Sequence, residues 1–200
     1  MTRGTLSPAN RILEIAATLP EGTPLSARSL LHLGSRVAID QALSRLARSG
    51  ALLRAGRGLY VRPVQTRFGV RAPAATAVLA RLAEETGEII VPHGAAAANA
   101  LGLTTQVPVR ELYLTSGRSQ KLRLGAQTIE LRHAPRWQLA GHRAGEAVRA
   151  LHWLGPAHGA SGVARLARSL RKPDVHQLLS LRSRLPNWLA REVSALAGRA

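Results

Sequence analysis

Apolar residues between Ser35 and Gly50 recur every three or four positions, which gathers them on one face of a helix. The apolar positions are Ile39, Ala42, Leu43 and Leu46, and the opposite positions are Gln41, Ser44, Arg45 and Arg48. Ser35 is placed to cap the first free backbone amides, and Gly50 can take the left-handed conformation that ends a helix. The pattern predicts a helix with one face for a core and one for a partner.

A short hairpin is predicted directly after this helix. Residues 51–54 and 59–62 are strand-like runs, and they flank the segment Ala55-Gly56-Arg57-Gly58. Its glycines permit the positive φ angles that a tight turn needs. The hairpin would therefore carry Arg57 at its tip.

Two further helices are predicted before residue 35. Ser7-Pro8 has the residue types favoured at a helix start, and the apolar spacing continues to Leu19. A second, short helix is predicted at about residues 26–33. Three helices followed by a hairpin resemble the winged helix-turn-helix of DNA-binding proteins. The residues that carry this resemblance are Leu43, Leu46, Gly50, Leu52, Arg57, Gly58 and Tyr60.

The resemblance implies contacts with duplex DNA, because a helix of this length fits the major groove and a basic hairpin reaches phosphates or the minor groove. Gln41 and Ser44 would meet base edges, and Arg57 would serve the wing. The full predicted set of DNA-binding residues is Ser35, Arg36, Gln41, Ser44, Arg45, Arg48, Arg54, Arg57 and Arg62. The alternative is that the charged face is only solvated.

The charge of the chain favours a polyanionic partner. The chain has 200 residues, with 28 Lys and Arg against 11 Asp and Glu, and a net charge of +17. An arginine-rich, lysine-poor composition can also reflect genome base composition, so the distribution matters more. Residues 1–71 hold 11 basic and 3 acidic side chains, a denser surplus than in the rest. The sequence shows no apolar signal core and no apolar run long enough to span a bilayer, so we expect a cytoplasmic protein without a membrane partner. The absence of cysteine does not by itself determine the redox compartment.

The second part of the chain predicts a small sheet and several helices. Residues 64–72 lack periodicity and are interpreted as a connector, so the predicted domains are 1–71 and 72–200. The predicted helices are 72–87, an alanine-rich helix ending near 101, 146–154, 163–170, 175–181 and 188–196. The predicted strands are 88–91, 111–115, 120–124 and 127–132. We therefore predict an α+β fold, with the alanine-rich helix packed closely on the sheet.

The segment PHGAAAANALGLTTQVP followed by ELYLTSG resembles the AbiEi (abortive infection) antitoxin family of bacterial type IV toxin-antitoxin systems. The matching residues are His93, Gly94, Ala97, Ala98, Leu101, Gly102, Leu103, Gln106, Pro108, Tyr113, Leu114, Thr115 and Gly117. Residues 141–200 match only in helical character and in the turn at 185–188. The resemblance implies an N-terminal domain that binds the operon's own promoter and a C-terminal domain that counteracts a nucleotidyltransferase-like toxin.

Catalytic chemistry is not predicted. Aspartate occurs only at Asp40 and Asp174, so the close Asp pair of two-metal nucleases and nucleotidyltransferases is missing. The seven histidines include no pair with helical metal-ligand spacing, and neither a Gly-x-Ser-x-Gly elbow nor a phosphate-binding loop occurs. We expect no enzyme, no metal and no cofactor, although a site made of glutamates alone stays open. His93 can either touch a nucleotide phosphate or cap a helix locally.

The favoured hypothesis is a DNA-binding repressor that is also a type IV antitoxin. Its expected partners are double-stranded DNA, at repeated sites in its own promoter, and a nucleotidyltransferase-like toxin. The alternative is a winged-helix transcription factor whose C-terminal domain binds a ligand or protein unrelated to a toxin. A homodimer and a monomer that binds cooperatively are both compatible with repeated half-sites.

Overall fold

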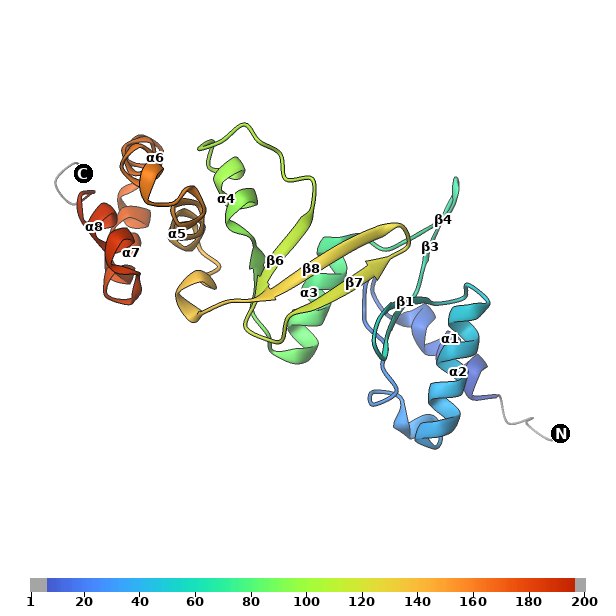
Figure 1. Cartoon of the computed structure of the whole chain (residues 1–200). Coiled ribbons are helices and arrows are strands. Elements are labelled where there is room, and N and C mark those ends of the chain that lie inside the picture. Colours follow the sequence, from blue (N-terminus) through green and yellow to red (C-terminus); the bar gives the residue numbers. More distant parts are fainter. Residues whose placement is uncertain (1–6, 197–200) are drawn as a thin grey trace. The chain divides into compact units, whose positions relative to one another are not determined.

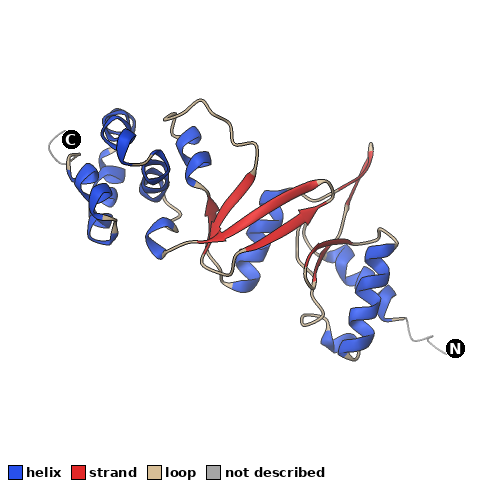
Figure 2. Ribbon diagram, in the orientation of Figure 1, coloured by secondary structure: helices blue, strands red, loops and turns tan. Residues whose placement is uncertain are grey.

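The protein has a mixed α+β fold, as predicted, in a computed structural model that describes residues 7–196 (Figure 1). The chain divides into two compact units, which comprise residues 1–88 with 121–129 and residues 89–120 with 130–200. Helices and small sheets occur in both (Figure 2).

The first unit begins with α1 (Pro8–Thr18), which starts as predicted: the Ser7 hydroxyl accepts a hydrogen bond from the Asn10 amide at 3.3 Å. The helix predicted at 26–33 is wrong, because only its end forms a short 3₁₀ helix, η1 (Leu31–Leu33). Ser26 and Ser29 explain the difference. Each hydroxyl accepts the other's backbone amide at 3.2 Å, so the side chains offer the backbone a turn in place of a helix.

Helix α2 (Arg36–Arg48) forms where the apolar spacing predicts it. The Ser35 hydroxyl accepts the Ala38 amide at 3.3 Å, and Gly50 takes the left-handed conformation with φ +77°. The apolar face of α2 joins the core of the first unit. This core also includes Ile12, Leu30, Leu52 and Tyr60.

The predicted hairpin is present as β1 (Leu53–Gly56) and β2 (Leu59–Val61). Its turn consists of Arg57 and Gly58 alone, so it is tighter than the four-residue segment expected. Gly58 has φ +68°, which only glycine adopts readily. Leu25 pairs with this hairpin in the way a third strand would, because it exchanges two backbone hydrogen bonds with Tyr60, at 2.7 and 2.9 Å.

The segment interpreted as a connector is a second hairpin, formed by β3 (Val64–Thr66) and β4 (Gly69–Arg71). The Thr66 hydroxyl stabilises its turn by donating to the Gly69 carbonyl at 2.8 Å. At its base, Arg71 contacts the Glu21 carboxylate at 2.9 Å. The connector prediction was wrong because three-residue strands that are exposed on both faces give no alternating pattern.

Helix α3 (Ala75–Thr86) follows the second hairpin and ends at Gly87 in the left-handed conformation. The predicted domain boundary after residue 71 lies between β4 and α3. The strands that follow are β5 (Ile90–Pro92), β6 (Glu111–Thr115), β7 (Gln120–Leu124) and β8 (Gln127–His133). They form one sheet in the order β5-β6-β8-β7, and the division between the two units crosses β7 and β8.

The C-terminal part is helical, as predicted. After the 3₁₀ helix η2 (Arg136–Gln138) come α5 (Arg143–Leu154), α6 (Pro156–Ser169), α7 (Lys172–Leu181), η3 (Arg182–Arg184) and α8 (Asn187–Ser194). Leucine, valine and alanine side chains from these helices form most of the core of the second unit, and residues 97–103 complete it. No helix among residues 7–196 is both long enough and apolar enough to cross a membrane.

The alanine-rich helix α4 (Gly94–Ala100) packs chiefly against α5, so the prediction that it lies on the sheet is wrong. Its glycine has a packing role. A Cβ added to Gly94 would clash with the Arg149 carbonyl oxygen and would lie only 2.7 Å from the Trp153 Cβ. Because backbone lies so close, only glycine fits at this helix crossing.

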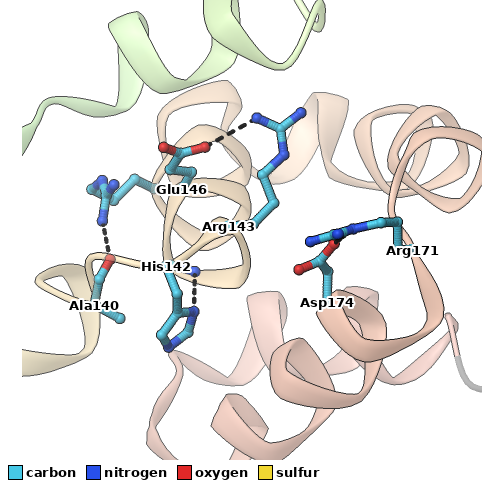
Figure 3. A network of polar contacts seen from close by, with 8 residues as sticks. Ala140, His142, Arg143, Glu146, Arg171 and Asp174 are labelled. Atoms are coloured by element: carbon cyan, nitrogen blue, oxygen red, sulfur yellow. Dashed lines mark hydrogen bonds and ion pairs between the residues drawn. The ribbon is translucent and has the colours of Figure 1, made fainter.

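Polar contacts fix the beginning of α5 (Figure 3). The ring of His142 accepts the Gly145 amide at 3.2 Å, and Arg143 contacts the Glu146 carboxylate at 3.2 Å. At the start of α7, the guanidinium of the N-cap residue Arg171 lies 3.0 Å from the Asp174 carboxylate and lowers the pKa of that group. These contacts stabilise the ends of the helices in which they lie.

Candidate nucleic-acid interface

The polar face of α2 is exposed to solvent. Gln41, Ser44, Arg45 and Arg48 are all exposed, whereas Ile39, Ala42 and Leu43 on the opposite face have no accessible surface. Val37, at the start of the helix, is also 65% exposed. Because the apolar face packs α2 against the core, the polar face remains in solvent.

Two predicted contact residues have local roles in the same helix. The Ser35 hydroxyl is the cap of α2. Arg36 Nε donates to Asp40 Oδ2 at 2.9 Å, and both side chains are more than half exposed. Exposed ion pairs of this kind contribute little to stability, but the pair neutralises part of the charge of Arg36. The unpaired positive charge of α2 therefore lies in its last turn, at Arg45 and Arg48.

The β1–β2 hairpin presents arginine on a fixed backbone. Arg54 and Arg57 are exposed, whereas Ala55 and Tyr60 are buried in the same hairpin. The strand register shifts between Arg54 and Gly56, an irregularity of the β-bulge type. Bulges re-aim the side chains beside them, and the exposure of Arg57 places the tip arginine on the outside of the unit.

A shallow hollow of about 520 Å³ brings together Arg54 and Arg57 with Lys121 and Arg123 of β7. Residues 121–129 belong to the first unit, so this cluster lies within one compact body. Sequence reasoning placed the two arginines in the interface but not Lys121 or Arg123. The alternation of β7 could show that these two residues share a face, but no local pattern shows which element they approach.

Arg62 is exposed but does not join that cluster. It lines a separate small hollow with Glu21, Leu25 and Val64. All nine predicted contact residues are therefore exposed, and the structure brings two of them, Arg54 and Arg57, into one hollow.

The second unit has its own hollow of about 620 Å³, lined by residues that include His93, Tyr113 and Trp153. The ring of His93 accepts the Ala95 amide at 3.3 Å, so this histidine is the cap of α4. Burial lowers the pKa of His93, and the nearby charges of Arg132 and His152 act in the same direction. Burial raises the pKa of Tyr113.

Within the part of the chain that the structure describes, no three His, Asp or Glu side chains are grouped as a metal site.

Comparison with known proteins places the chain in one family. No curated protein and no solved structure matches it. Residues 11–177, which include most of both units, match the model of a family described as a family of unknown function (DUF6088). The chain therefore belongs to the DUF6088 family.

Proposed function

We propose that this protein binds double-stranded DNA through α2 and the β1–β2 hairpin, in the manner of a winged helix-turn-helix. One observation supports the proposal most directly. The solvent face of α2 presents Gln41, Ser44, Arg45 and Arg48, while its apolar face is buried. Amide and hydroxyl side chains suit base edges in the major groove, and arginine suits guanine or phosphate.

The rest of the first unit supports the same reading of α2. The pairing of Leu25 with Tyr60 ties the hairpin to the segment after α1. The hairpin thus has a fixed position beside the helical core, as a wing requires. Phosphate contacts from Arg54 and Arg57 would set the register, and Gln41 and Ser44 would then read sequence.

The biological role we propose is a repressor of its own operon that is also the antitoxin of a type IV system. The partner of the second role is a nucleotidyltransferase-like toxin. This part of the proposal rests on the resemblance of residues 92–117 to the AbiEi family. In the structure these residues form α4, the loop after it and β6.

Binding to the DNA upstream of the gene tests the DNA-binding role. Titrations at several salt concentrations should show specific binding by the wild type. Arg48→Ala with Arg57→Ala should weaken binding and lower the slope of log K against log salt by about 2, since each lost phosphate contact removes about 0.9. Arg182→Ala with Arg184→Ala is the matched control for lost charge, because both residues are exposed on η3. An unchanged slope in the first variant would contradict the assignment.

Co-expression with the neighbouring gene tests the antitoxin role. If that gene encodes a nucleotidyltransferase-like toxin, its expression alone should arrest growth and this protein should restore it. A variant with Arg48→Ala and Arg57→Ala should still restore growth when expressed from an independent promoter, because the two roles are assigned to different units. Failure of the wild type to rescue growth would reject the antitoxin role and leave the DNA-binding role standing.

The second candidate is a winged-helix transcription factor whose second unit binds a small molecule. The hollow lined by His93, Tyr113 and Trp153 favours it, because apolar walls with a few polar groups are typical of ligand sites. A neighbouring gene unrelated to nucleotidyltransferases, together with a metabolite that changes DNA affinity, would favour this candidate. Trp153→Ala should then abolish the metabolite effect and leave the DNA affinity without metabolite unchanged.

A further inference from the structure

We propose that Lys121 and Arg123 of β7 extend the wing, so that together with Arg54 and Arg57 they bind successive phosphates of one DNA strand. The inference rests on the proposed DNA-binding function and adds to it a third element, the β7–β8 hairpin. Neither the sequence pattern nor the winged-helix resemblance includes this hairpin in the interface.

The alternation of β7 directs its two cations outward. Leu122 and Leu124 are buried, with 0% and 1% exposure, and hold one face of the strand against the protein. Lys121 and Arg123 alternate with these leucines along the strand, so their side chains lie on the opposite face, and both residues are exposed. The strand therefore presents two positive charges on the same side.

The wing and β7 are in direct contact. A Cβ added to Gly56 would lie 3.5 Å from Leu122 Cδ2 and 3.9 Å from the Lys121 carbonyl oxygen. Gly56 is the last residue of β1, immediately before the tip arginine. The contact brings the cations of two segments, far apart in the sequence, to the walls of one hollow.

The lining of this hollow contains no carboxylate to offset its positive charges. Its lining consists of Arg54, Ala55, Gly56, Arg57, Lys121, Leu122, Arg123 and Thr128, and none of these is acidic. Elsewhere in the chain, arginines such as Arg36, Arg71 and Arg143 have carboxylate partners. Among residues 7–196, the ion pairs include none of the four cations of the hollow. Four like charges around one hollow repel each other, and a bound anion relieves that repulsion.

The form of the hollow favours a polyanion over a small anion. All four cations are exposed, so the site is an open surface without the buried donors that would enclose a single phosphate. Duplex DNA carries one negative charge about every 1.7 Å along its axis, so a strand that crosses the hollow can meet several cations at once. The hydroxyl of Thr128 is a further donor for a phosphate oxygen.

Salt titrations of the double variant Lys121→Gln/Arg123→Gln test the inference. Two lost phosphate contacts should lower the slope of log K against log salt by about 2, equally for the specific and for an unrelated duplex. Sequence preference should not change. The charge-conserving variant Lys121→Arg/Arg123→Lys should keep the wild-type slope. The matched control is Arg182→Gln/Arg191→Gln, which removes two exposed charges from the second unit.

Circular dichroism and a thermal melt should show that each variant is folded like the wild type. If Lys121→Gln/Arg123→Gln has the same salt slope as the control variant, the inference is overturned. The proposed DNA-binding function would then still stand, provided that the wild type binds specifically and in a salt-dependent way. A wild type that does not bind duplex DNA would overturn both. A drop in affinity for only one sequence would overturn the phosphate assignment, because a backbone contact acts on every sequence alike.

Discussion

Two helices of nearly equal length, α2 and α5, use arginine in opposite ways. α2 has 13 residues and keeps Arg45 and Arg48 in solvent at its last turn. α5 has 12 residues and buries Arg149, whose side chain is only 2% exposed. The Arg149 guanidinium donates to the carbonyl oxygens of Gln138 and Ala140, at 3.0 and 2.7 Å.

The difference shows that the setting of an arginine, more than its presence, decides its role. On α2 the cation remains hydrated and can exchange water for a phosphate at little cost. On α5 the cation has lost its water, and burial lowers the pKa of Arg149. It instead ties η2 and the segment after it to the helix. One arginine is available to a ligand, and the other is part of the fold.

The largest effect should come from Arg149→Ala. The substitution leaves two partly buried carbonyls without their donor and opens a cavity, so the free energy of unfolding should fall by about 3 kcal/mol. Urea denaturation followed by circular dichroism measures the loss. Arg45→Ala, on the exposed face of α2, is the matched control and should change stability by less than about 0.5 kcal/mol. Equal losses in the two variants would remove the contrast between the helices.

Gln41→Ala should weaken specific binding by about 1 to 3 kcal/mol, because a side chain that meets a base edge discriminates against other bases. Affinity for an unrelated duplex should stay the same, and the salt slope should not change. Fluorescence anisotropy with both duplexes measures the ratio. A uniform loss for both sequences would make Gln41 a backbone contact in place of a base reader.

Two serines of the same region should differ in their effect on stability. Ser35→Ala removes the cap of α2 and should lower the free energy of unfolding by about 1 kcal/mol. Ser44→Ala, in the exposed middle of the helix, should change it by a few tenths at most. Thermal melts of both variants measure the difference. Ser35→Asn should restore most of the loss, since asparagine also caps helices well.

The smallest expected effect is a pH dependence of stability that arises in the second unit. The pKa of His93 lies below its usual value of 6.5 in the folded protein, so the unfolded chain binds more protons as the pH falls past that value. Stability should therefore be complete above pH 6.5 and decline as the pH falls toward the lowered pKa of His93. His93→Asn keeps a capping side chain without a titrating group and should flatten this decline. Because burial also lowers the pKa of His152, some decline should persist in the variant. An unchanged profile would contradict the role assigned to His93.

Structural features that have a strong local sequence pattern were predicted. Features that have a weak pattern, or that depend on distant segments, were not. The apolar spacing of α2, its cap and its glycine stop were all visible in the chain and are confirmed. The serine turn at Ser26 and Ser29 was missed because side-chain competition outweighed helical spacing. The β3–β4 hairpin was missed because it buries almost no side chain and so leaves no alternation.

The sequence by itself determined the mixed α+β content, the two-faced character of α2 and the arginine at the hairpin tip. These features follow from periodicity and turn chemistry, which act over a few residues. Only the tertiary structure decided that α4 packs on α5 and that Gly94 is needed at their crossing. It likewise decided that Lys121 and Arg123 lie beside the wing. Contacts between distant segments depend on how whole faces fit together, and no local spacing records which face meets which.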